Sequence, residues 1–189
     1  MTMDETTYRK ICAHFASLLS YPRPDLAHLA QTCRDLLAAE HPAASAALES
    51  FRRFAVLQEQ AHLEEIYTAT FDLQPHCHPY VGYHLFGEGK QRPFFMVKLQ
   101  ECYQRHGYAC RGELPDHLSE VLGFLAMVED ETARQELVED GLLPALGKMN
   151  QGADAATHPY ADVLRALEDF LAAETPAGNA TCLLQEVES

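Results

Sequence analysis

Apolar side chains recur every three or four residues in one segment after another of this 189-residue chain. In the first segment, this spacing places on one helix face the side chains of Tyr8, Ile11, Cys12, Phe15, Leu18 and Leu19. No convincing stretch alternates apolar and polar residues with the period of two that a half-buried β-strand requires. The pattern therefore predicts an all-α fold, a single bundle of about eight to ten helices.

The expected helices are separated by prolines, by glycines and by points where the helical spacing of the apolar residues shifts. The two prolines in 21–24 should end the first helix, and Pro42 suits the first turn of the third. The helical spacing of the apolar residues shifts near 56–58, which predicts either two helices or a bend there. Later segments expected to be helical are 80–86, 91–106, 116–128, 131–142, 144–150 and a last helix from 159. Residues 1–173 should form the helical domain and 174–189 a poorly packed tail.

The balance of charge narrows the class of partner. The chain has 14 basic and 28 acidic residues, a formal net charge of −14, which disfavours nucleic acid and anionic lipid and favours a basic protein or peptide. Its apolar runs fall far short of the roughly 20 residues that span a bilayer, and its acidic start does not resemble an export signal. Six cysteines without closely paired spacing indicate free thiols. We therefore expect a cytoplasmic protein that does not insert into a membrane.

Candidate catalytic and metal-binding motifs are weak. The run His76-Cys77-His78 offers metal-binding side chains, but adjacent residues rarely converge on one ion, and no second pair has zinc-finger spacing. The Glu59-x-x-His62 spacing occurs once, whereas a di-iron bundle needs it twice. Gly87-Glu-Gly-Lys90 lacks the other positions of a phosphate-binding loop. We expect no catalytic residue, cofactor or resident metal, and a metal-binding helical protein using residues 76–78 stays as the weaker alternative.

Aromatic and acidic residues gather in the middle of the chain. Those that precede the 91–106 segment are Tyr67, Phe71, Asp72, Tyr80, Tyr83 and Phe86. Each ring taken alone is more often part of a core than of a binding surface. Together with Glu113 and Asp116, the group is also suited to line a groove for a basic amphipathic helix. The rings would bury the apolar side chains of that helix, and the carboxylates would pair with its Arg or Lys side chains.

The segment Glu113-Leu-Pro-Asp-His-Leu118 stands directly before the amphipathic stretch 119–128. An Asp in front of a helix can accept a hydrogen bond from a free backbone N–H of the first turn. We therefore expect Asp116 to cap the helix that follows, with the acidic charge placed favourably for the helix dipole. This is a scaffold feature and not a catalytic one.

Several pieces of the chain, taken in order, resemble the NarJ-type nitrate reductase assembly chaperones, which belong with the wider TorD and DmsD redox-enzyme maturation proteins. The pieces are Tyr67-x-x-x-Phe71-Asp72, the segment 80–89, the helix 95–107, the motif 113–118 with its continuation to Phe124, and the last helix from Pro159. The Glu-x-Pro-Asp-His element is the most specific of them. The resemblance covers roughly residues 8–173 and implies the TorD/NarJ-like helical bundle.

The resemblance implies a cytoplasmic chaperone that catalyses no reaction. Its partner would be the apo catalytic (alpha) subunit of a nitrate reductase or a related molybdoenzyme, bound through a basic N-terminal segment. The chaperone would assist insertion of the molybdenum cofactor and delay membrane attachment or export. An accessory subunit retained in the reductase complex is the alternative. We expect a monomer or, if halves exchange across the connection 71–79, a domain-swapped dimer.

The resemblance also indicates which residues contact the partner. They are Tyr67, Phe71, Asp72, Tyr80, Tyr83, Glu113, Pro115, Asp116, His117 and Glu120. The family motif commonly has a glutamate directly before the phenylalanine, where this chain has Gly123. Glycine there removes a carboxylate and costs about 1 kcal/mol of helix propensity. Glu120, one turn earlier, is the carboxylate expected to replace it.

Overall fold

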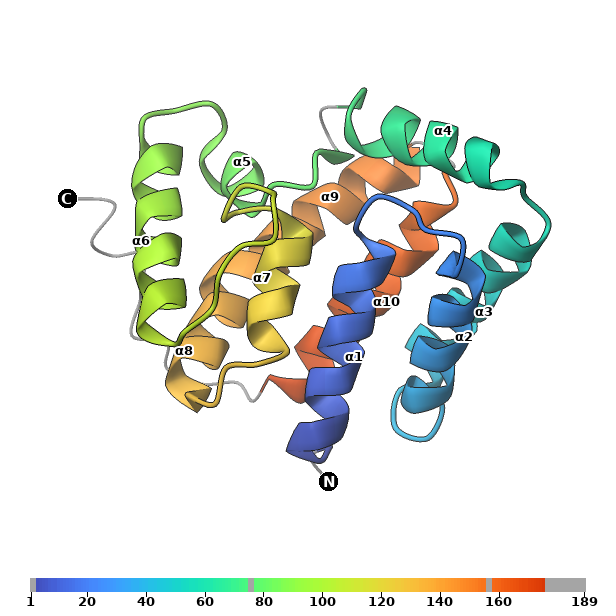
Figure 1. Ribbon diagram of the computed structural model, residues 1–189, viewed down its shortest axis with the longest axis horizontal. Coiled ribbons are helices and arrows are strands. Elements are labelled where there is room, and N and C mark those ends of the chain that lie inside the picture. Colours follow the sequence, from blue (N-terminus) through green and yellow to red (C-terminus); the bar gives the residue numbers. More distant parts are fainter. Residues whose placement is uncertain (1–2, 75–76, 156–157, 176–189) are drawn as a thin grey trace.

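The computed structural model describes residues 3–74, 77–155 and 158–175 (Figure 1). Its helices are α1 (Glu5–Leu18), α2 (Leu26–Leu37), α3 (Pro42–Val56), α4 (Gln60–Phe71), α5 (Val81–Phe86), α6 (Gln91–Arg105), α7 (Leu118–Leu125), α8 (Glu131–Glu136), the π-helix η2 (Leu137–Leu142), α9 (Leu143–Ala155) and α10 (Tyr160–Glu174). The prediction of an all-α fold is confirmed. Among the helices described, none has both the length and the apolar character needed to cross a bilayer.

Helix α10 lies in the interior of the bundle. It packs against α3 and α9 and also contacts α1, so this one helix joins elements that come early and late in the sequence (Figure 1). Apolar residues cover more than one face of this helix, as expected for a helix surrounded by others. Its buried side chains are Tyr160, Ala161, Val163, Leu164, Ala166, Leu167, Phe170 and Leu171.

Most helix boundaries agree with the sequence pattern. The phase slip at 56–58 falls between the end of α3 and the start of α4, and Pro42 occupies the first turn of α3. Gly107 follows α6 with a φ of 72°, a left-handed conformation that favours glycine. The expected helix 131–142 is α-helical only as far as Glu136, and its second half is the π-helix η2. The segment is helical throughout, as predicted, but the sequence pattern does not reveal the change to a π-helix.

The predicted boundary of the C-terminal tail falls inside α10. Glu174, the last residue of that helix, accepts a hydrogen bond from Met3 N at 3.3 Å and pairs with His41 Nε2 at 2.9 Å. Both side chains of the His41 pair are about nine-tenths buried, since 8% and 10% are exposed. Glu174 is therefore part of the packed bundle, and the rest of the predicted tail, 176–189, lies outside the described residues.

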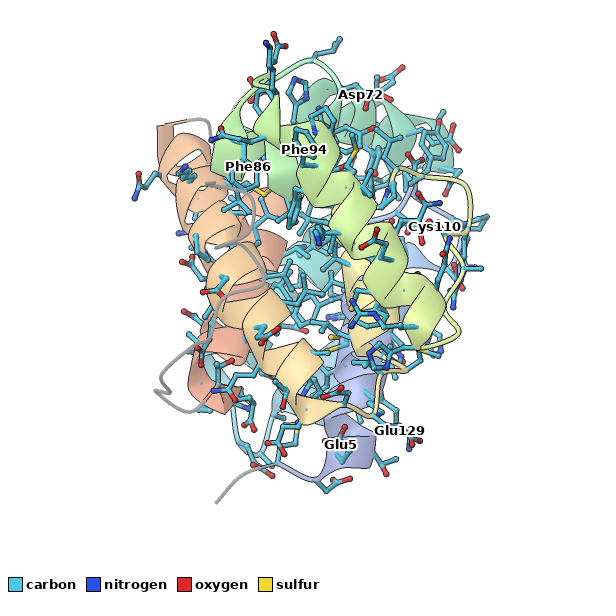
Figure 2. All side chains as sticks on the ribbon, turned by 90° about the vertical axis from the view of Figure 1, so that its left-hand side faces the viewer. Glu5, Asp72, Phe86, Phe94, Cys110 and Glu129 are labelled. Carbon is cyan, nitrogen blue, oxygen red and sulfur yellow. The ribbon has the colours of Figure 1, made fainter. Side chains whose placement is uncertain are left out.

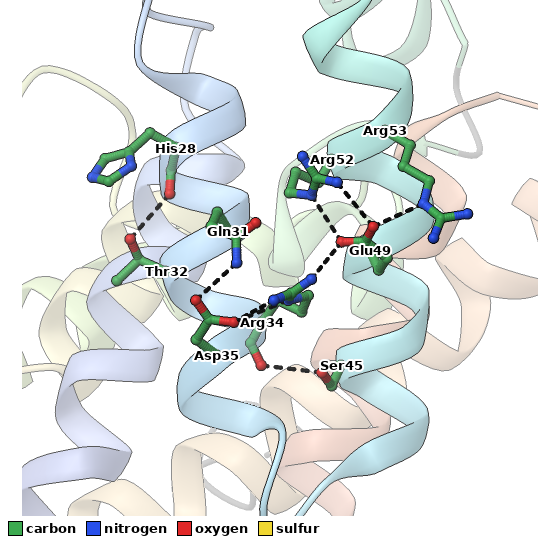
Figure 3. Close-up of polar contacts among 9 residues, drawn as sticks. All are labelled: His28, Gln31, Thr32, Arg34, Asp35, Ser45, Glu49, Arg52 and Arg53. Atoms are coloured by element: carbon green, nitrogen blue, oxygen red, sulfur yellow. Dashed lines mark hydrogen bonds and ion pairs between the residues drawn. The ribbon is translucent and has the colours of Figure 1, made fainter.

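Helices α2 and α3 form a hairpin that ion pairs join on its outer side (Figure 3). Glu49 accepts hydrogen bonds from Arg52 Nε, Arg53 Nε and Arg34 Nη1, each at 2.8 Å, and Arg34 Nη2 also contacts Asp35 at 2.6 Å. We call these five residues the hairpin network. Hydrogen bonds from the three guanidinium groups hold the pKa of Glu49 well below its usual range. Solvent screens surface pairs of this kind, so each contributes little stability.

Candidate functional site

A short backbone pairing holds the motif 113–118 against the start of α5. Residues 79–81 and 116–118 form an isolated antiparallel bridge, with Tyr80 opposite His117. Each of its two backbone hydrogen bonds is 2.7 Å long. Because the two segments are distant in sequence, this pairing fixes the position of the motif relative to α5 and α6.

Asp116 is fully buried and forms an ion pair with Arg92 at the start of α6. Arg92 Nε donates to Asp116 Oδ2 at 2.8 Å, and its guanidinium carbon lies 5.0 Å from the centroid of the Tyr80 ring. Helix α5 approaches so closely that a Cβ added to Gly82 would lie 2.8 Å from Asp116 Oδ2. The Asp116 carboxylate therefore faces Arg92 and makes no cap for α7. The prediction that Asp116 caps this helix is wrong.

His117 occupies the capping position of α7. His117 Nδ1 accepts a hydrogen bond from Ser119 N at 3.1 Å, and its ring meets the edge of the Tyr80 ring at a centroid distance of 5.3 Å. The cap requires an unprotonated Nδ1. Burial lowers the pKa of His117, although the carboxylates around it act in the opposite direction. The buried environment thus favours the neutral imidazole that the cap needs.

Glu120 anchors the loop that precedes the motif. Its carboxylate is buried and accepts hydrogen bonds from the Tyr108 hydroxyl and from Arg111 N, each at 2.8 Å. A Cβ added to Gly123 would collide with the Tyr108 hydroxyl. The glycine that departs from the family pattern therefore leaves room for the Tyr108–Glu120 hydrogen bond. We call Arg92, Asp116, Tyr108 and Glu120 the interior network.

Tyr67 and Phe71 belong to the core. Phe71 is fully buried, and the Tyr67 hydroxyl donates to Leu19 O at 3.1 Å. Both rings contact Tyr160 of α10, with centroid distances of 5.8 Å for Tyr67 and 5.0 Å for Phe71. These contacts align α4 on the central helix. Direct contact of either ring with a partner would require α4 to move.

Of the residues predicted to contact a partner, Asp72 and Glu113 are exposed at the surface and Tyr80 is half-buried. We call these three residues the acidic-aromatic face. Asp72 directly follows α4 and lies at the top of the molecule in Figure 2, and Glu113 opens the motif. Burial raises the pKa of the half-buried Tyr80, and the Glu113, Asp116 and Asp72 carboxylates raise it further. His78 Nδ1 donates to Phe71 O at the end of α4, and Tyr80 pairs with His117, so the end of α4, the bridge and the motif lie in one region.

Tyr83 and Pro115 lie in local contacts of the α5 and α6 region. Tyr83 is half-buried and meets the His78 ring edge-on at a centroid distance of 5.1 Å. Pro115 O accepts a hydrogen bond from the Tyr103 hydroxyl at 2.9 Å. Both residues help to fix the local fold, and their contact with a partner stays a prediction.

A family model described as the nitrate reductase delta subunit matches residues 34–174. This chain belongs to that family. NarJ of Bacillus subtilis, a protein assigned as a nitrate reductase molybdenum cofactor assembly chaperone, is 34% identical over 88 residues, which span 46% of this chain and 47% of that protein. A solved structure from Archaeoglobus fulgidus, classed as a redox enzyme maturation protein, superposes with a TM-score of 0.58 and 24% sequence identity. The match covers 87% of this chain and 93% of the Archaeoglobus chain. This second likeness shows the fold.

The candidate metal ligands of this delta subunit family member are dispersed. Cys77 Sγ lies 3.5 Å from His158 Nε2, and His78 Nδ1 donates to Phe71 O at 3.0 Å. His76 lies outside the described residues. Within the part of the chain that the structure describes, no three His, Cys, Asp or Glu side chains are grouped as a metal site requires.

Three residues of the site are missing from the sequence-based prediction, namely Arg92, Tyr108 and Gly82. Nothing in the local sequence around Arg92 indicates that its partner, Asp116, stands 24 residues further along. The contact of Tyr108 could have been anticipated in part. A glycine inside a strongly helical stretch often indicates that another group approaches the helix closely. Gly123 is such a glycine, and the group that approaches it is the Tyr108 hydroxyl.

Proposed function

We propose that this protein is a chaperone for the apo catalytic subunit of a nitrate reductase or a related molybdenum oxidoreductase, and that it assists insertion of the molybdenum cofactor. Membership of the delta subunit family supports this function, as does the assignment of the Bacillus subtilis relative. The function is binding and not catalysis. It takes place in the cytoplasm, before the client attaches to a membrane or is exported.

The observation that carries the proposal is the acidic-aromatic face. Its two surface carboxylates, Asp72 and Glu113, stand on segments that the His78–Phe71 hydrogen bond and the Tyr80–His117 bridge hold together. The buried Arg92–Asp116 pair fixes the motif beneath them. A surface that is already ordered loses little conformational entropy when a partner binds. Clustered carboxylates favour a partner that carries Arg or Lys, so a basic N-terminal segment of the client is the ligand we propose.

In this proposal the central motif positions the binding surface. Asp116, His117 and Glu120 are all buried, with exposed fractions of 0%, 3% and 3%. Their polar groups already bond to Arg92, to Ser119 N and to the loop at Tyr108 and Arg111. The motif residues therefore act on the partner through the surface that they hold in place.

The test is affinity capture of the tagged protein from two strains, one able and one unable to make the molybdenum cofactor. We expect the catalytic subunit to be recovered in larger amount from the strain without cofactor, because the chaperone holds the apo form. Mass spectrometry identifies and quantifies the captured subunit. Equal recovery of a cofactor-loaded complex from the wild-type strain would instead favour an accessory subunit.

A further inference from the structure

The outer surface of α4 carries a groove that the motif does not explain. This open hollow has a volume of about 470 Å³, and its lining residues are Tyr21, Ala61, Glu64, Glu65, Thr68, Ala69 and Leu73. Tyr21 follows α1, Leu73 follows α4, and the other five lie on α4. We call this the α4 groove.

Helical spacing explains the position of the α4 groove. Residues 61, 64, 65, 68 and 69 recur at intervals of three or four and so share the outer face of α4. The opposite face is buried in the bundle through Leu63, Tyr67, Thr70 and Phe71. Ala61, Thr68 and Ala69 are small, so the backbone of another helix can come close to this face.

Two large apolar side chains at the α4 groove are exposed to solvent. Leu73 is 72% exposed and Tyr21 is 55% exposed. The Tyr21 ring is nevertheless held in place, because its edge meets the Tyr67 ring at a centroid distance of 5.6 Å. A partner that covers Tyr21 and Leu73 gains the free energy of removing both from water.

The charge of the α4 groove is negative. Glu64 and Glu65 line it, and no lining residue is Lys or Arg. His62 lies 3.3 Å from Glu65 and carries charge only when protonated. Asp72 directly precedes the lining residue Leu73, so the groove and the acidic-aromatic face adjoin at the end of α4. A second copy of a chain with a net charge of −14 would be repelled here.

We propose that the α4 groove is the docking surface for a basic amphipathic helix. Apolar side chains of that helix would pack between Tyr21 and Leu73, and its Arg or Lys side chains would pair with Glu64, Glu65 and Asp72. This inference rests on the proposed function, because the helix would belong to the client. The proposed function names the kind of partner, and this inference adds where the partner helix binds, on α4 and outside the motif 113–118.

The probe is a synthetic helix-forming peptide of about 15 residues with leucines on one face and arginines on the other. Leu73→Ser should weaken its binding about tenfold, because an exposed anchor is lost. Glu64→Gln combined with Glu65→Gln should weaken binding and reduce its dependence on salt. Fluorescence anisotropy at low and high salt measures both effects, and circular dichroism shows whether each variant is folded.

Matched controls lie away from the α4 groove. Val97→Ser removes an apolar side chain that is 53% exposed on α6, and Glu129→Gln with Glu131→Gln removes two exposed carboxylates near α8. Neither control should change the affinity. A peptide with glutamates in place of arginines should not bind. Equal effects of the groove variants and the controls would overturn the inference.

The inference and the proposed function fail in different ways. If wild type and Leu73→Ser capture the apo catalytic subunit equally well, the chaperone function stands and the α4 groove is not its docking surface. If neither protein captures the subunit, the proposed function fails. If Leu73→Ser alone loses capture while Val97→Ser retains it, both are supported.

Discussion

The hairpin network and the interior network use the same chemistry in different surroundings. Glu49 has three arginine partners, yet its side chain is 20% exposed and those of its partners are 25% to 74% exposed. Asp116 has a single arginine partner and is 0% exposed. Water can replace a lost partner of Glu49, but it cannot reach Asp116. The comparison teaches that burial, more than the number of partners, decides how much an ion pair matters.

The largest effect is expected when Asp116 loses its partner. Arg92→Met keeps a long apolar side chain but leaves a buried carboxylate unpaired, so the free energy of unfolding should fall by about 3 kcal/mol. Arg92→Lys keeps the charge without the guanidinium geometry and should cost less. Urea unfolding followed by circular dichroism measures both. A loss for Arg92→Met no larger than that for Glu49→Gln would break the comparison.

The second effect concerns the space beside Gly123. Gly123→Ala places a methyl group against the Tyr108 hydroxyl and should displace the ring from Glu120, at a net cost of about 2 kcal/mol in unfolding free energy. Tyr108→Phe removes the hydroxyl and should make the alanine less costly. A double-mutant cycle by urea unfolding measures this coupling. Additive losses would mean that the two residues do not compete for the same space.

The third effect depends on pH. Because burial lowers the pKa of His117, the neutral ring stabilises the fold fully above the usual histidine pKa of about 6.5. That stability is lost as the pH falls from there through the lower pKa of the folded state. His117→Asn keeps a capping side chain that does not titrate, so wild type should lose about 1 kcal/mol more than the variant between pH 7.5 and pH 5. Parallel pH profiles would contradict this.

The smallest effect is expected at the hairpin network. Glu49→Gln should lower the thermal midpoint only slightly, and the difference from wild type should shrink as salt rises. Since the pKa of Glu49 is lowered, its contribution is present above the usual glutamate pKa of about 4.3 and disappears as the pH falls toward the folded value. Thermal unfolding at two salt concentrations and two pH values tests this. A loss that does not respond to salt would place Glu49 with the interior network.

The two networks also show how far the sequence can be interpreted. The helices on both sides of 56–58 and the start of α3 at Pro42 follow from local spacing, and both predictions are confirmed. For the cap of α7, the local pattern points to Asp116, whereas the capping residue is His117. A local pattern cannot distinguish a carboxylate that caps the next helix from one that meets Arg92 on an earlier helix.

The sequence also does not show which polar residues of the motif are buried. The motif residues are chemically suited to contact a partner, yet Asp116, His117 and Glu120 are inside the protein. The pairing of 79–81 with 116–118 encloses them, and it depends on the path of the chain through α6. Tyr21 and Leu73 stand in connecting segments without an apolar period, so nothing in the local sequence indicates that they line one groove.

The central position of α10 has a consequence for synthesis of the chain on the ribosome. Helices α3 and α9 both pack on α10, which follows them in the chain and so leaves the ribosomal exit tunnel after them. Until it emerges, the apolar faces that later cover Leu164, Leu167 and Phe170 have no native partner. The bundle can therefore complete its core only after α10 has emerged, and the nascent chain depends until then on protection from aggregation.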